Sequence, residues 1–187
     1  MIFDQPQQPI QLQDRSAQRL AGIAKLIAAF EASFASVRYR VLDKISTVNA
    51  QASFSGGEPR VEIFGGLAFH PSIGHDGLTF TLLHETGHHL STGCQLPWAP
   101  LACECAADRW AATDGRKALR ANGAKFRLDV ALRQIEGAAT PQRQQPSSRR
   151  TARTDCWSMN WRKRKQALLD GRAVNLQSCE ISSAIGR

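Results

Sequence analysis

The chain has 187 residues, of which 42% are hydrophobic and 21% charged, and its formal net charge is +8. This length suits one domain, and the hydrophobic content is ordinary for a globular protein with its own core. The sequence has no apolar run of about eighteen residues, so we expect no membrane span. It also does not begin with the basic residues and apolar stretch of a signal peptide, so we expect a cytoplasmic location.

The positive charge is concentrated near the carboxyl end. Residues 1–140 carry a net charge of +1, whereas residues 141–187 carry +7. Polar residues and prolines fill the region between the two parts, which is typical of a linker. We therefore expect a folded domain over 1–140, a polar linker over 141–156 and a basic tail over 157–187 that can hold a short helix. Such a tail is either simply solvated or binds nucleic acid or another anionic partner.

Hydrophobic spacing indicates both helices and strands in the first 140 residues. The first helix has apolar residues at spacings of three and four, and β-branched and aromatic residues then flank a Gly- and Pro-containing turn. Further helical segments follow. The expected helices span 14–34, 77–91, 99–119 and 124–136, and the expected strands span 46–54 and 60–64.

The segment "HETGH" places His84 and His88 four residues apart on a predicted helix, with Glu85 beside the first histidine. Residues at this spacing differ by about 40° in rotation and roughly 6 Å in rise, so both imidazoles can reach one ion. Glu85 is poorly aimed for a ligand but well placed to contact a water molecule. H-E-x-x-H is the pattern of zinc hydrolases for this reason. Gly87, which is costly inside a helix, indicates that another backbone packs closely there.

A catalytic zinc takes three protein ligands and keeps one position for water, so a third ligand is required. Downstream candidates are Glu104, Asp108, Cys103 and Cys105, while His89 faces another side of its helix. Glu104 fits best. Asp108 follows it by four residues and can accept the free ring N–H of a zinc-bound histidine. The five cysteines, an odd number without a signal peptide, are interpreted mostly as core residues.

"HETGHH" followed by "ECAADRWAA" resembles the gluzincin metallopeptidases with H-E-x-x-H and E-x-x-x-D motifs, including the soluble part of the HtpX-like group. The upstream "VNAQASFSGGEPRVEIFGGLA" is similar to a segment of the same group, and the resemblance covers about residues 45–115. It implies a zincin-like α+β fold. A small twisted antiparallel or mixed sheet would accompany an active-site helix with the H-E-x-x-H motif and a following helix with Glu104.

The resemblance also implies roles for individual residues. His84, His88 and Glu104 would bind Zn²⁺, and Glu85 would be the catalytic base. Asp108 would orient a histidine. Asn49 and Ala50 would lie along an extended peptide substrate at the edge of the sheet.

The group's downstream His or Arg, which steadies the oxyanion, has no clear match in this sequence. Arg109, His70 and His75 are candidates by proximity alone. The ImmA/IrrE-like peptidases, which also combine H-E-x-x-H with a Glu-bearing helix, are the competing resemblance.

The sequence thus predicts a zinc metalloendopeptidase, a hydrolase that acts on extended peptides or proteins. The alternative from another functional class is a zinc-stabilised, non-catalytic module whose basic tail binds nucleic acid, with Trp157 and Trp161 as stacking residues. The two tryptophans can instead be interpreted as a hydrophobic anchor that folds the tail back onto the domain.

Overall fold

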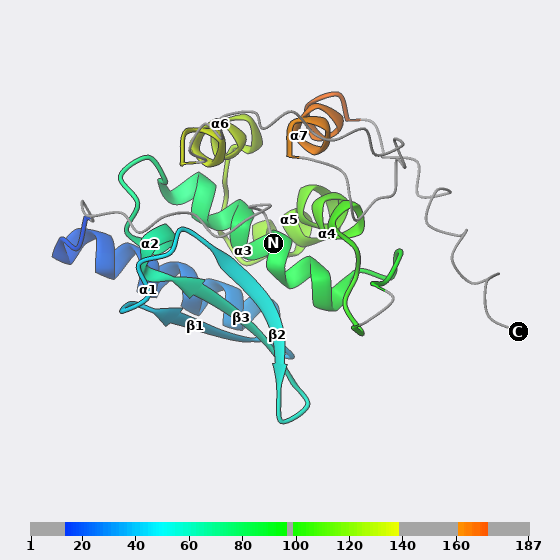
Figure 1. Cartoon of the computed structure of the whole chain (residues 1–187), viewed down its shortest axis with the longest axis horizontal. Coiled ribbons are helices and arrows are strands. Elements are labelled where there is room, and N and C mark those ends of the chain that lie inside the picture. The colour runs from blue at the N-terminus through cyan, green and yellow to red at the C-terminus, as the bar shows by residue number, and fades with distance from the viewer. Residues whose placement is uncertain (1–13, 97–98, 139–160, 172–187) are drawn as a thin grey trace, which may run out of the picture.

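A small mixed sheet packs on one side of a long central helix, and further helices cover the other side (Figure 1). The computed structural model describes residues 14–96, 99–138 and 161–171. The strands are β1 (Arg38–Leu42), β2 (Ala50–Ser55) and β3 (Glu58–Phe64). The helices are α1 (Ala17–Ser33), α2 (Gly65–Ala68), α3 (His75–Leu90), α4 (Glu104–Trp110), α5 (Arg116–Ala121), α6 (Leu128–Ala138) and α7 (Trp161–Leu169), with a π-helical turn, η1 (Ala111–Gly115), between α4 and α5.

The sheet has the strand order β1-β3-β2. β1 pairs with β3 in parallel, and β2 pairs with β3 in antiparallel fashion, with Ala50 opposite Ile63. β2 is therefore an edge strand, and it lies beside α3. The expectation of an α+β fold with a small mixed sheet is confirmed at this level.

Two elements, β1 and α2, were not expected from the sequence. β1 is only five residues long and alternates exposed Arg38 and Arg40 with buried Tyr39, which gives little hydrophobic signal. α2 is a single turn where Gly65 and Gly66 lie against the backbone of residues 43–47, and a Cβ on Gly66 would collide with the backbone of Ser46. Glycine is needed at this close approach.

α1 attaches to α3 through the sheet. Ser16 caps α1 by accepting a hydrogen bond from the Arg19 N–H, as expected for a helix start. Phe30, on the buried face of α1, meets the Tyr39 ring edge-on with 5.4 Å between centroids. The Tyr39 hydroxyl is hydrogen-bonded to the Thr86 hydroxyl at 2.9 Å. These contacts fix the middle of α3 against β1 and α1.

The beginning of α3 is held by a side chain of another helix and not by its own Asp76. The Gln134 side chain of α6 accepts hydrogen bonds from the backbone N–H of Gly74 at 3.0 Å and of Gly77 at 2.8 Å. Asp76 instead accepts from the backbone N–H of Arg127. A side chain 57 residues away in sequence thus satisfies the free N–H groups of this helix end.

The end of α3 packs closely on α4, as Gly87 indicated. A Cβ built on Gly87 would lie 2.8 Å from the Ala107 carbonyl oxygen and 3.2 Å from the Trp110 ring. The helix expected over 99–119 begins at Glu104 and passes through the π turn η1 before α5. None of the helices in the described part of the chain combines the length and apolar composition that a bilayer crossing needs.

The contact at Gly87 gives a stability prediction. Gly87→Ala should lower the free energy of unfolding by about 1–3 kcal/mol, because the methyl group overpacks the boundary between α3 and α4. Urea denaturation measures this change. The matched control is Gly22→Ala on α1, where a Cβ meets nothing within 4 Å and the substitution should be neutral or stabilising. Equal stability of Gly87→Ala and the unmodified protein would contradict the close approach.

Candidate metal centre

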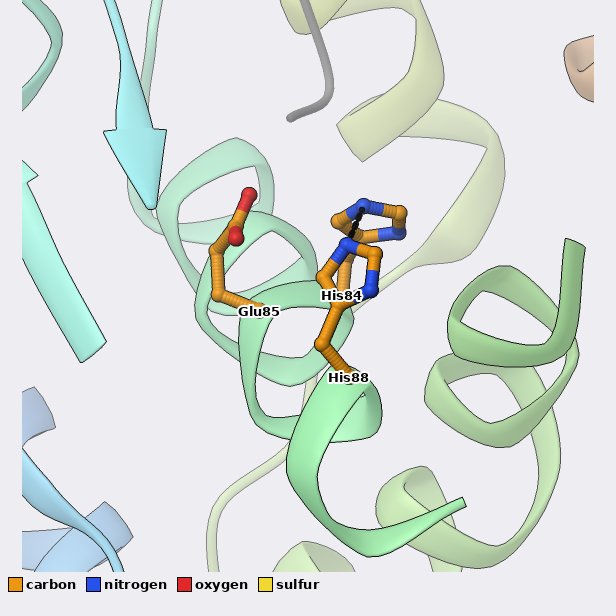
Figure 2. A group of neighbouring side chains, drawn as sticks. All are labelled: His84, Glu85 and His88. Carbon is orange, nitrogen blue, oxygen red and sulfur yellow. Dashed lines mark hydrogen bonds between the residues drawn. The ribbon is translucent and has the colours of Figure 1, made fainter. Parts of the chain in front are cut away.

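α3 places the buried side chains of His84, Glu85 and His88 close together (Figure 2). The Nε2 atoms of His84 and His88 lie 3.1 Å apart, and Glu85 offers a carboxylate oxygen within 4.8 Å of ring nitrogens of both histidines. His84 and Glu85 are fully buried, and His88 is 4% exposed. Polar side chains so deeply buried require partners or an ion.

The other ring nitrogen of each histidine faces an oxygen. The Nδ1 atom of His84 lies 2.8 Å from Asp108 Oδ1, and the Nδ1 atom of His88 lies 2.7 Å from the Ala102 carbonyl oxygen. Because these oxygens only accept, the proton of each ring in its neutral form lies on Nδ1, and this form, the one that binds a metal, has a lone pair on Nε2. Two lone pairs then point towards the same place, an arrangement that a bound cation stabilises.

Glu104, the first residue of α4, supplies a carboxylate to the same place. Its Oε2 atom is 3.3 Å from His84 Nε2, and its Oε1 atom is 3.6 Å from His88 Nε2. Donors around a tetrahedral zinc with bonds of about 2.0–2.1 Å lie roughly 3.3 Å from one another. The two imidazoles and this carboxylate therefore fit Zn²⁺ in both donor type and spacing.

Arg164 of α7 joins the centre from a part of the chain that the sequence indicated to be a basic tail. Its side chain is buried, with 1% exposed. Nε donates to Asp108 Oδ2 at 2.7 Å and Nη2 donates to Asp108 Oδ1 at 2.9 Å, while Nη1 lies 2.7 Å from Glu104 Oε2. One guanidinium thus contacts both carboxylates of α4.

These ion pairs decide the charge of the two carboxylates. Burial alone would raise the pKa of Asp108, but the Arg164 guanidinium outweighs burial and lowers that pKa to about 2. For Glu104 the same opposition between burial and Arg164 leaves the pKa well below its ordinary value. Burial would likewise lower the pKa of His84, yet Asp108 and Glu104 together raise it. Both carboxylates are therefore ionised at neutral pH.

Glu85 has a different environment from Glu104. Neither of its carboxylate oxygens accepts a hydrogen bond within the described residues, although the Ala52 backbone N–H is near enough to favour the charged form. Burial is the largest influence and raises the pKa of Glu85. A buried carboxylate with so little support is unfavourable for folding, which points to a chemical role.

The expected substrate-binding residues lie at the start of the edge strand. Asn49 precedes β2, is buried, and accepts the Phe64 N–H through its backbone oxygen at 3.0 Å. Ala50 is the first residue of β2 and is also buried. Ala52, two residues further along, is the β2 residue whose backbone approaches Glu85.

Other ligand candidates are engaged elsewhere. Cys103 and Cys105 belong to a separate buried cluster with Ala102 and Ala106. His89 directs Nε2 towards the Arg60 carbonyl oxygen at 2.9 Å. Within the described residues, the α3 trio of His84, Glu85 and His88 is close enough to share an ion, and Glu104 lies beside both of its histidines.

For the three residues expected as candidates for stabilising an oxyanion, the observed contacts and exposure do not involve this centre. His70 accepts the Ser72 N–H through Nδ1, His75 is exposed with Nε2 3.3 Å from the Lys125 carbonyl oxygen, and Arg109 is exposed. Sequence reasoning missed Arg164, the cation that does reach the centre. The only indication in the sequence was that Arg164 lies between two apolar residues, Trp161 and Leu168. In the structure, both of these residues pack against the core.

Comparison with protein-family models, curated proteins and solved structures finds no match for this chain. The resemblance to the HtpX-like gluzincins therefore stays a prediction from motifs.

Zinc titration tests the assigned donors. We expect one Zn²⁺ per chain, lost or greatly weakened in Glu104→Ala, and bound about 10–100-fold more weakly in Asp108→Asn, which removes the charge beside His84. Competition with a chromophoric chelator measures the affinities. Glu31→Ala, which removes an exposed carboxylate on α1, is the control. Unchanged affinity in Glu104→Ala would remove this residue from the donor set.

Arg164 should also support folding. Arg164→Met leaves two buried carboxylates without their cation and should lower the free energy of unfolding by about 3–5 kcal/mol. The control is Arg162→Met, an exposed position on the same helix, which should change stability little. Thermal and urea unfolding of the metal-free proteins compare the two variants. Similar small effects for both would show that the ion pairs contribute nothing net.

Proposed function

We propose that this protein is a zinc-dependent peptidase. The observation that supports the proposal most directly is the convergence of His84, His88 and Glu104 beside a buried, poorly supported Glu85. Three protein donors with an adjacent free carboxylate are typical of catalytic zinc sites, whereas structural sites usually have four protein ligands.

The proposed ion would be held by the two Nε2 atoms and the Glu104 carboxylate. When bound, Zn²⁺ supplies a Lewis acid that polarises a carbonyl group and makes a nearby water acidic at neutral pH. The protein's part is to keep the donors in place. Asp108 fixes the ring of His84, the Ala102 carbonyl fixes the ring of His88, and Arg164 neutralises part of the carboxylate charge.

Glu85 is the proposed general base. Burial is the main cause that raises the pKa of Glu85, so this pKa lies closer to neutral pH than that of an exposed glutamate. It would accept a proton from the attacking water and pass it to the nitrogen of the departing amine.

The edge strand β2 is the proposed binding place for the substrate backbone. Extended peptides add to an exposed strand through main-chain hydrogen bonds, and this mode requires no particular side chain. β2 is free on the side away from β3 within the described sheet, and Ala52 brings its backbone next to Glu85. A peptide on this edge would pass close to the proposed base.

A non-catalytic zinc module is the second candidate, and one observation favours it. The donors are closed in, since even the Glu104 side chain is only 18% exposed, and closed sites are typical of structural zinc. The nucleic-acid part of this alternative is less well supported. Arg164 is engaged in buried ion pairs and Trp161 packs against the core, while Trp157 lies outside the described residues.

Substitution of the base separates these candidates. Glu85→Gln should retain zinc but reduce the hydrolysis of unstructured proteins or peptide mixtures by at least about 100-fold, because an amide cannot take the proton from the attacking water. Zinc content and product formation are measured on the same preparations, with and without a chelator. Chelator-sensitive cleavage at an unchanged rate in Glu85→Gln would contradict the assigned base. Tight zinc binding without any cleavage by the unmodified protein would favour the structural role.

A further inference from the structure

Phe54, on the edge strand β2, exposes an aromatic side chain close to the candidate centre. Its side chain is 43% exposed, one of the larger hydrophobic exposures in the described residues. The ring stands edge-on to the His89 ring, with 5.0 Å between centroids and 90° between planes. His89 holds its own position through the Arg60 carbonyl oxygen.

The side chain of Phe54 lies on the same face of the sheet as two earlier residues of β2. Side chains alternate along a strand, so those of Ala50, Ala52 and Phe54 point to one face. The contact between the Phe54 and His89 rings identifies this face as the one towards α3, and the Ala52 backbone comes near Glu85 of the same helix. Glu85 and His89 are four residues apart on α3, about 6 Å along the helix. β2 and α3 therefore run in the same direction, from amino to carboxyl end, along this contact.

The backbone groups of these same residues point to the free edge of β2. In an antiparallel pair, residues that bond to the partner strand alternate with residues that direct N–H and C=O away from it. The Phe64 N–H donates to the Asn49 carbonyl, so Asn49 bonds inward. Given the observed register, Gln51 and Ser53 also bond inward to β3. Ala50, Ala52 and Phe54 then present their backbone groups outward.

We propose that Phe54 determines specificity by favouring a large apolar side chain on the amino-terminal side of the scissile bond. This inference rests on the proposed peptidase function. A substrate strand that pairs with the free edge in antiparallel fashion, the slightly more stable arrangement, runs from Phe54 towards Ala50. Its residue opposite Phe54 projects to the same face and lies against that ring.

The position of the preferred side chain follows from the strand geometry. The substrate residue opposite Phe54 lies two residues before the one opposite Ala52, which is next to Glu85. The apolar preference should therefore fall about two or three residues before the cleaved bond. Small side chains at Ala50 and Ala52 make no comparable demand on later positions.

A peptide library with one varied position at a time tests this role. The unmodified protein should prefer Phe, Leu or Met over Ala and Asp at the stated position. Phe54→Ala should lower kcat/KM for the apolar peptides by about tenfold, the usual effect of losing contacts in a hydrophobic subsite. Phe54→Leu should restore most of the preference. Phe54→Glu should shift it towards Lys and Arg through charge complementarity.

Two controls make the result specific. Leu20→Ala removes another exposed hydrophobic side chain, on α1, and should leave the preference unchanged. Binding of uncleaved fluorescent peptides to zinc-loaded Glu85→Gln, with and without Phe54→Ala, should show the same difference between apolar and polar peptides. Cleavage with the same preference in Phe54→Ala and the unmodified protein overturns the role of Phe54 and leaves the peptidase standing. Failure of the unmodified protein to cleave any peptide overturns the peptidase and this inference with it.

Discussion

The buried ion pairs between Arg164 and the two carboxylates of α4 are the interaction on which the candidate centre depends. Two ionised carboxylates could not remain in this interior without a compensating cation, because the desolvation of each charge is costly. One guanidinium offsets only one of the two charges. The remaining negative charge lies on the side where the lone pairs of His84 and His88 also converge. Protein charges and ring tautomers thus favour a cation at the same place.

Packing between α3 and α4 converts this charge arrangement into defined distances. Gly87 brings the α4 backbone against α3, and the Trp110 ring lies between Gly87 and Gly115 of the π turn. A π turn widens the helix by one residue and often occurs near functional sites. The loop before α4 adds a reciprocal pair, since the Ala102 N–H donates to the His88 carbonyl and the Ala102 carbonyl faces His88 Nδ1.

The sequence predicted the parts of the centre that depend on local geometry. His84 and His88 share a helix face because of their four-residue spacing, and Glu104 with Asp108 repeats this spacing on the next helix. What the sequence could not show is a contact between distant segments. Arg164 lies 56 residues after Asp108, in a stretch whose composition is that of a solvated basic helix. The role of Gln134 at the start of α3 was missed for the same reason, because nothing local marks a side chain that caps a remote helix.

The position of Arg164 changes what the basic end of the chain means. Net charge counts residues without regard to burial, so a cluster of Arg and Lys suggests an anionic partner outside the molecule. In this fold one of those charges finds its anions inside, and Trp161 and Leu168 pack on the core beside it. Because Arg164 touches both a proposed ligand and the carboxylate that orients His84, the docking of α7 and the geometry of the donors depend on one another. The candidate centre is therefore assembled from three helices, α3, α4 and α7, of which the last is distant from the others in the sequence.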